Sequence, residues 1–144
     1  MALARTRKRL AAVVGLAVTM AAGGAVLASP ASAGPNCASG YHCVFYLGFD
    51  SAKHSYFNSD TNFSGDTFNQ GSGLSGYGQS VNDNVVSASN SSNSNYESHY
   101  YVNSNYGTFL FCVNPGSSVE YLPSSKQNLA SSLRLRGRTT ISCY

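Results

Sequence analysis

The hydrophobic pattern changes at about residue 33. Residues 10–27 form an uninterrupted run of apolar and small side chains, and Ala31-Ser32-Ala33 follows it. A basic cluster precedes the run: Arg5, Arg7, Lys8 and Arg9. These are the parts of a secretory signal peptide: a basic start, an apolar run that is short for a membrane span, and an A-x-A cleavage site. We therefore expect residues 1–33 to be removed and residues 34–144 to be a single secreted, extracellular domain without a membrane anchor.

After Cys43 the apolar residues come in short runs separated by clusters of Gly, Asn and Ser, a pattern typical of β-strands joined by turns. The predicted strands are residues 44–47, 54–58, 67–69, 85–89, 98–102, 108–113, 119–122 and 130–136. Residues 70–79 (QGSGLSGYGQ) predict a loop, and residues 90–95 (NSSNSN) predict a polar linker between two halves. Asn114-Pro115-Gly116 predicts a turn, because Pro fixes φ and Gly accepts a positive φ.

The composition supports an all-β domain. The chain has 10 Tyr and 7 Phe but no Trp, and both of its Met residues lie in the expected leader. Aromatic residues favour strands, and Asn, Ser and Gly favour turns, whereas good helix formers are scarce after the leader.

The charge balance argues against two kinds of partner. The formal net charge of +3 comes from the leader, since four of the nine Lys and Arg lie there and the remaining five face six Asp and Glu. This balance gives no case for nucleic acid or for a polybasic membrane contact. In the last predicted strand, Leu133 and Leu135 alternate with three arginines: Arg134, Arg136 and Arg138. We favour a solvated sheet face that discourages edge pairing over a site for an acidic partner.

The four cysteines all follow the leader: Cys37, Cys43, Cys112 and Cys143. An even number of cysteines in a small exported domain predicts two structural disulfides. Three pairings are possible. The preferred one joins Cys37 to Cys43 in a tight loop and Cys112 to Cys143 in a loop of moderate length.

The sequence carries no recognisable catalytic set. H-E-x-x-H, G-x-S-x-G and a phosphate-cradling glycine loop of the G-x-x-x-x-G-K-[ST] type are all missing from it, and disulfide-bonded cysteines are not nucleophiles. There is no C-x-x-C, and His42, His54 and His99 have no metal-ligand spacing. We therefore expect a protein that is not an enzyme and that holds no metal or other cofactor.

The two halves repeat weakly. Residues 57–65 parallel residues 100–108, each with aromatic residues around an Asn and a nearby Gly. Further along, residues 83–88 (DNVVSA) parallel residues 127–132 (QNLASS).

These repeats and the opening C-A-S-G-Y-H-C-V-F-Y resemble the secreted bacterial βγ-crystallin-like peptidase inhibitors typified by the Streptomyces metalloproteinase inhibitor. The other segments that carry the resemblance are N-F-S-G at 62–65, V-N-D-N at 81–84, P-G-S-S at 115–118 and A-S-S-L-R at 130–134. The resemblance implies a βγ-crystallin-like Greek-key β-sandwich of two four-stranded motifs, motif one at about residues 43–90 and motif two at about 98–143.

Some crystallin-like motifs bind calcium through two Asn or Asp, two variable residues, then Ser or Thr and a final Ser. The segment Asp83-Asn84-Val85-Val86-Ser87 follows this pattern until Ala88, and Gln127-Asn128 lacks a carboxylate. Since Asp83 would be the only acid, we expect no working metal site and a calcium affinity that is millimolar or weaker.

The resemblance also implies a function, inhibition of an extracellular peptidase, with a metallopeptidase as the expected target. Inhibition needs a rigid loop that loses little entropy on binding, and the disulfide-anchored stretch is the candidate: Cys112, Val113, Asn114, Pro115 and Gly116. Val113 would be the apolar residue after the scissile bond; in the alternative arrangement it lies inside a strand and only the turn is exposed. The alternative function is a secreted binding or killer-toxin-like antimicrobial module without inhibitory activity. We expect a monomer.

Overall fold

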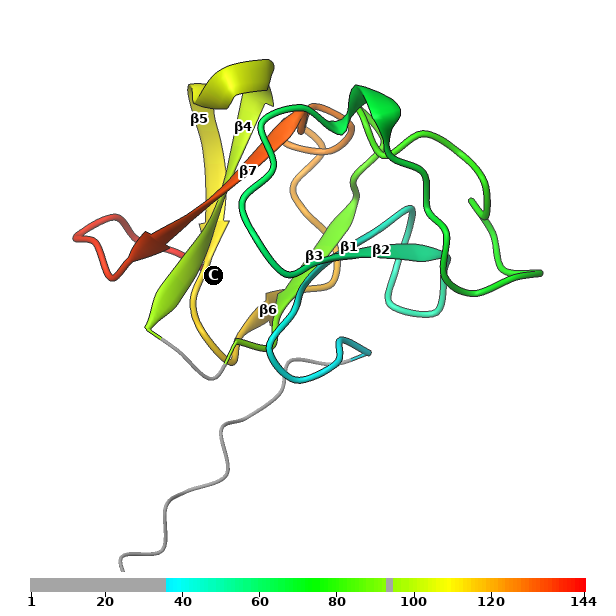
Figure 1. The fold of residues 1–144 in the computed structure, drawn as a ribbon, viewed down its shortest axis with the longest axis horizontal. Helices are drawn as coiled ribbons and strands as arrows, with labels where there is room; N and C mark the ends of the chain where they lie inside the picture. The colour runs from blue at the N-terminus through cyan, green and yellow to red at the C-terminus, as the bar shows by residue number, and fades with distance from the viewer. Residues whose placement is uncertain (1–35, 93–94) are drawn as a thin grey trace, which may run out of the picture.

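The computed structural model describes residues 36–92 and 95–144, and the expected leader lies outside this range. Two antiparallel sheets pack together (Figure 1). The first sheet has the order β2-β1-β3-β6: β2 (Lys53–Tyr56), β1 (His42–Phe45), β3 (Ser87–Asn90) and β6 (Ser118–Val119). The second has the order β5-β4-β7: β5 (Gly107–Val113), β4 (Tyr96–Asn103) and β7 (Ser132–Gly137). Two short 3-10 turns, η1 (Phe63–Gly65) and η2 (Ser104–Tyr106), complete the described elements.

The two halves exchange segments between the sheets. β6, from the second half, pairs with β3 in the first sheet, where Ala88 lies opposite Val119. In return, Asp60 of the first half pairs with Leu133 of β7 through two backbone hydrogen bonds of 2.8 Å. Each sheet is therefore built from both halves, which is the connection of a Greek-key sandwich. The predicted all-β fold is confirmed.

The halves are related by an internal repeat whose register differs from the sequence comparison by one residue. The backbone N–H of Asp83 donates to the carbonyl of Ala130 (3.0 Å), and the N–H of Asn128 donates to that of Val85 (2.9 Å). The same offset in residue number thus relates Asp83 to Asn128 and Val85 to Ala130. Asp83 and Asn128 also share a left-handed backbone, with φ of 56° and 57°. Pairing Asp83 with Gln127 was therefore wrong, because hydrogen-bond register, and not local similarity, relates the two halves.

Aromatic side chains fill the space between the sheets. Tyr100 stacks on Phe111 with ring centroids 4.5 Å apart, and Tyr56 stacks on Phe63 at 4.9 Å. All four lie in one core cluster, and burying rings of this size is a large part of the stabilisation available to a small domain.

Every predicted strand except residues 67–69 overlaps an observed one. There, Thr67 makes only an isolated bridge to Ser80, because the backbone of Phe68 bonds to the far end of the glycine-rich loop. The polar linker was also placed too early: Asn90 ends β3 and is fully buried. Its side-chain Nδ2 donates to the carbonyls of Tyr96 (2.9 Å) and Val113 (3.1 Å), which ties the two sheets together.

Both preferred disulfides, Cys37–Cys43 and Cys112–Cys143, are present. The first closes the loop that leads into β1, and the second joins β5 to the C-terminal segment. Within the described part of the chain, no helix has the length and apolarity needed to cross a membrane.

Candidate functional site

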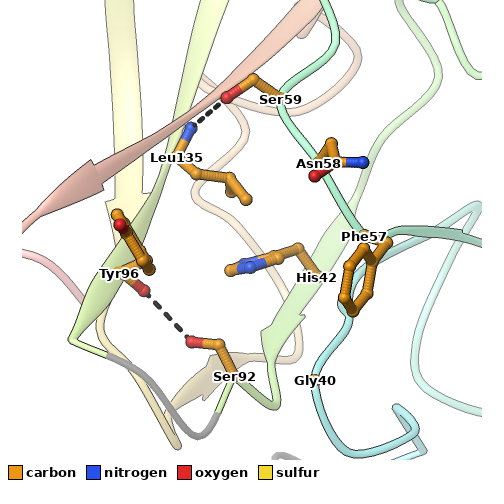
Figure 2. Close-up of a pocket in the computed structure, with 8 residues that line it drawn as sticks. All are labelled: Gly40, His42, Phe57, Asn58, Ser59, Ser92, Tyr96 and Leu135. Carbon is orange, nitrogen blue, oxygen red and sulfur yellow. Dashed lines mark hydrogen bonds between the residues drawn. The ribbon is translucent and has the colours of Figure 1, made fainter.

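A cleft of about 520 Å³ opens where the two sheets meet near the start of β1 and β4 (Figure 2). Its lining comes from both halves: Gly40, His42, Phe57, Asn58, Ser59, Ser92, Tyr96 and Leu135. None of these side chains is an acid, a lysine or an arginine. The cleft is therefore an uncharged cavity in which aromatic and small polar groups face one another.

Exposed aromatic rings form the rim of the cleft. Phe57, just after β2, is 63% exposed, and Tyr96, the first residue of β4, is 50% exposed. Tyr41 packs against Phe57 with ring centroids 5.5 Å apart, a contact that restricts the motion of the Phe57 ring. Gly40 lines the same wall with a φ of 89°, a backbone that other residues rarely adopt, so glycine is required for this turn. Large exposed rings beside a cavity are typical of recognition surfaces.

The imidazole of His42 points into the cavity from β1 (Figure 2). Its Nδ1 lies 2.6 Å from the hydroxyl oxygen of Ser98, a buried residue on β4, so the opposite sheet fixes the orientation of the ring. Burial lowers the pKa of His42 to about 4. The ring is consequently neutral at physiological pH, and Nε2 is the ring nitrogen left for a ligand.

Two serines of the lining are held by the fold. The hydroxyl of Ser59 accepts a hydrogen bond from the backbone N–H of Leu135 (2.9 Å), and that of Ser92 donates to Asn90 Oδ1 (2.6 Å). Asn58 is exposed beside them. The polar groups of the cleft are thus mostly fixed before any ligand arrives, which reduces the entropy lost on binding.

The sequence predicted none of this cleft. The sequence places Phe57 within the predicted strand 54–58 and assigns Tyr96 to no element, and it offers His42 only as part of the opening motif and as a histidine without metal-ligand spacing. The available signal was the aromatic residue at each strand end next to polar positions, but only the strand order shows that these ends meet.

The calcium-type segments meet at the interface of the two halves without forming a cage of acids. Asp83 accepts hydrogen bonds from Ser131 Oγ (3.1 Å) and from Asn82 Nδ2 (2.7 Å). Asn128 is the equivalent of Asp83 in the other half, and it carries no charge. The equivalent of Ser131 in the first half is Val86, which has no oxygen in its side chain. One carboxylate, already paired with protein donors, does not fit a tight site for a hard cation.

We therefore expect calcium to have little effect on stability. At a millimolar dissociation constant, about 1 mM calcium stabilises the fold by at most about 0.4 kcal/mol. The measurement is thermal unfolding with 1 mM calcium against a chelator. A rise in melting temperature above roughly 5 °C, on the order of 1 kcal/mol for a domain of this size, contradicts the prediction.

The candidate inhibitory loop divides into a buried part and an accessible part. Cys112 and Val113 lie within β5, and Val113 is 0% exposed, so the bond between them is out of reach of a peptidase in the folded chain. Only Asn114, Pro115 and Gly116 are partly exposed. They form the predicted turn: Ser117 N–H donates to the Asn114 carbonyl (3.0 Å), and Gly116 has a φ of 74°.

The arginine stripe matches the solvated face favoured from the sequence. Leu133 is fully buried, whereas Arg134, Arg136 and Arg138 are exposed. The guanidinium of Arg134 lies over the ring of Tyr106, 5.4 Å from its centroid.

The fold is βγ-crystallin-like: solved βγ-crystallin domains share the arrangement of two Greek-key halves that exchange segments between sheets. A domain solved in work on the evolution of the eye-lens βγ-crystallin fold has a TM-score of 0.50 and 18% identity, covering 71% of this chain and 90% of its own. A βγ-crystallin domain from Flavobacterium johnsoniae has a TM-score of 0.46 and 17% identity, covering 69% and 98%. The N-terminal domain of Protein S has a TM-score of 0.44 and 16% identity, covering 67% and 96%.

No family model and no curated protein matches the sequence. The comparisons therefore support a βγ-crystallin-like fold and leave peptidase inhibition and secretion as hypotheses.

Proposed function

We propose that this chain is an exported, non-enzymatic binding module whose cleft takes an uncharged ligand of the carbohydrate class. The observation that supports this most directly is the combination of an aromatic rim with an uncharged, partly preformed polar lining. The volume of about 520 Å³ lies within the ~300–1,000 Å³ typical of small-molecule sites.

The lining suits a sugar better than an ion or a lipid chain. A sugar ring has one face of C–H groups, which packs on an aromatic ring, and a rim of hydroxyls, which need donors and acceptors. Phe57 and Tyr96 supply rings, while Asn58, Ser59 and His42 supply hydrogen-bonding atoms. An ionic ligand would lose its hydration without gaining an oppositely charged partner from the lining.

The test is retention of the purified protein on insoluble β-linked glucan and N-acetylglucosamine polymers, followed by calorimetry with the matching oligosaccharides. We expect the variant Phe57→Ala to lower the affinity about tenfold or more, the loss of roughly 1.4 kcal/mol of binding free energy. Tyr121→Ala is the matched control, because Tyr121 is also 63% exposed but follows β6, at the opposite edge of the first sheet from β2.

Two outcomes would count against this proposal. Either no polymer retains the unmodified protein, or Tyr121→Ala weakens retention as much as Phe57→Ala, which would indicate nonspecific adsorption of aromatic side chains.

A second candidate function, inhibition of an extracellular metallopeptidase, has its own supporting observation in the rigidity of the turn at Asn114. The N–H of Asn114 donates to the Tyr144 carbonyl (2.9 Å), and the N–H of Gly116 donates to the Asn90 carbonyl (2.8 Å). The Cys112–Cys143 disulfide fixes the same segment covalently. A turn held in this way loses little entropy when a partner binds.

Titration against a panel of metallo- and serine peptidases tests this candidate. Stoichiometric inhibition that is lost in Pro115→Gly and kept in Phe57→Ala supports the turn as the inhibitory element. An absence of inhibition across the panel, together with growth arrest of fungi or bacteria, favours the antimicrobial alternative.

A further inference from the structure

A buried polar cluster lies on the face of the second sheet that points away from the core. Tyr100 of β4 faces the core, so Glu97 and His99 point to the opposite face of the sheet. They are nevertheless only 2% and 0% exposed. The chain end lies beside β4 and β5 and covers this face (Figure 1). The N–H of Tyr144 donates to the Cys112 carbonyl (3.0 Å), and Thr139 donates to Glu97 through its N–H (2.9 Å) and its hydroxyl (2.8 Å).

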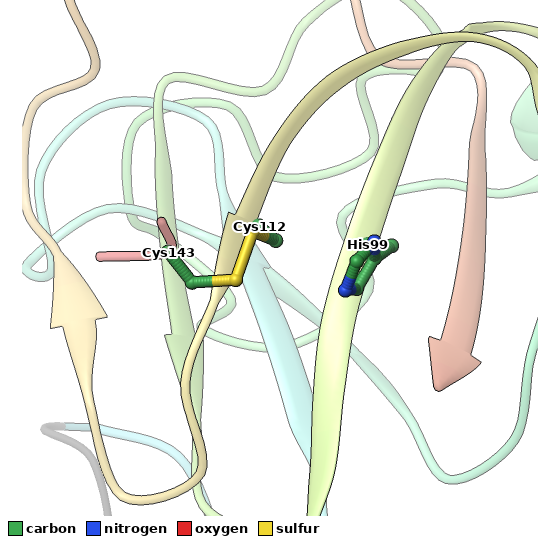
Figure 3. Close-up of side chains that lie close together, drawn as sticks. All are labelled: His99, Cys112 and Cys143. Carbon is green, nitrogen blue, oxygen red and sulfur yellow. A yellow bond between two sulfur atoms is a disulfide. The ribbon is translucent and has the colours of Figure 1, made fainter. Parts of the chain in front are cut away.

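His99 is held against the Cys112–Cys143 disulfide (Figure 3). It is the cross-strand partner of Cys112 in the β4–β5 register, and a nitrogen of its ring lies with the two sulfurs in a group spanning no more than 4.8 Å. Nε2 lies 2.7 Å from Glu97 Oε2, while Nδ1 is buried and has no hydrogen-bond partner among the described residues. A buried, unpaired imidazole nitrogen is costly, and the ring that carries this one lies beside two cysteines.

The donor atoms are those of a zinc site in which oxidation has joined the two sulfurs in a disulfide. Two cysteine sulfurs and one histidine nitrogen, with a fourth position open to water, are a known ligand set of Zn²⁺. A carboxylate on the other nitrogen of the histidine is the usual device that orients a metal-binding imidazole, and Glu97 stands in that place. In the disulfide the sulfurs are bonded to each other and neither is a thiolate, so the oxidised chain offers no such set.

We infer that, once the Cys112–Cys143 disulfide is reduced, this chain binds one zinc ion through Cys112, Cys143 and His99, with Glu97 as the positioning residue. A dithiol reductant supplies two electrons to the S–S bond and becomes a disulfide itself, and each sulfur takes up one proton. Zinc then binds as both thiol protons leave to solvent, so the net charge of the site is unchanged by the exchange of two protons for one divalent ion.

Contacts other than the S–S bond also hold the ligands together. The β4–β5 ladder fixes His99 opposite Cys112. Hydrogen bonds hold the segment that carries Cys143: besides the bonds to Tyr144 and Thr139, Asn114 Nδ2 donates to the Cys143 carbonyl (3.3 Å). The site is therefore largely formed in advance, which favours binding by the folded, reduced chain.

The test is anaerobic titration of the fully reduced protein with Co²⁺ and then Zn²⁺. We expect one equivalent of cobalt to give thiolate-to-cobalt charge-transfer absorption and the strong visible bands of a tetrahedral ion, zinc to displace it, and two protons to be released per metal. The variant Cys37→Ser/Cys43→Ser should bind as the unmodified chain does, whereas Cys112→Ser/Cys143→Ser, which keeps the other two thiols, should not. The oxidised protein is the remaining control.

Two further variants test the histidine and its partner. His99→Ala should abolish the tetrahedral spectrum, and Glu97→Gln should lower the zinc affinity about 10–100-fold. If His99→Ala does not fold, X-ray absorption of the zinc-loaded reduced protein decides the question, with two sulfurs at about 2.3 Å and a nitrogen from imidazole expected. Undiminished binding by Cys112→Ser/Cys143→Ser, or a metal shell without imidazole, overturns the inference.

Discussion

Replacing Phe111 with Ala is expected to lower the free energy of unfolding by about 3–5 kcal/mol. Phe111 is 1% exposed, stacks on Tyr100 and belongs to the core that both sheets share. Its removal leaves a cavity between two sheets that are tied to each other by strand exchange and cannot collapse freely. The measurement is urea unfolding followed by circular dichroism, with the slope of the transition compared between variants.

Phe109→Ala is the matched control, two residues away on the same strand. Phe109 is 42% exposed and contacts His99 and Tyr101 on the outer face, so its loss should cost about 1 kcal/mol or less. Equal destabilisation by the two variants would mean that the two rings share one face of β5.

Replacing Glu97 with Ala is expected to cost about 3–5 kcal/mol, because the change leaves a buried histidine and two partly buried donors of Thr139 without their acceptor. The carboxylate of Glu97 accepts hydrogen bonds from His99 Nε2 and from both the N–H and the hydroxyl of Thr139. Glu120→Ala is the control, since Glu120 is exposed and its loss should change stability by no more than about 0.5 kcal/mol.

The stabilisation by Glu97 should depend on pH in a defined direction. Burial alone would raise the pKa of Glu97, but the hydrogen bonds from His99 and Thr139 outweigh it and lower the pKa below its ordinary value of 4.5. A lowered folded-state pKa gives stability that is complete above the unfolded-state value and is lost as the pH falls through the folded-state value. The gap between the unfolding midpoints of the unmodified protein and of Glu97→Ala should therefore narrow as the pH falls below 4.5, and a constant gap would contradict this.

The sequence predicted the fold class and most strands because the signals for them are local. Short aromatic and β-branched runs between Asn, Ser and Gly clusters depend only on neighbouring residues, as does the Asn114-Pro115-Gly116 turn. The disulfide pairing was open among three arrangements, and the preferred one is present.

The candidate site depended on information that the sequence does not hold locally. The cleft joins the end of β2 to the start of β4 and to β7, and its floor is oriented by the bond from His42 to Ser98 across the sandwich. Val113 has the apolar side chain expected after the scissile bond of an inhibitor loop, but it lies at a fully buried strand position. Burial is a property of the packed sheets and not of the residue.

The bulge in the second sheet is the clearest feature that the tertiary structure decided and the sequence pattern did not predict. Strict alternation in β5 would place Phe109 and Phe111 on one face. The register shift between Tyr100 and Tyr101 inserts one residue into β5, so Phe111 enters the core and Phe109 packs outside with His99. The sequence by itself determined that these residues form strands and that two disulfides cross-link the domain. Which ring is buried, and which histidine meets a disulfide, was decided by hydrogen-bond register between strands distant in the chain, because a one-residue shift reverses every side chain that follows it.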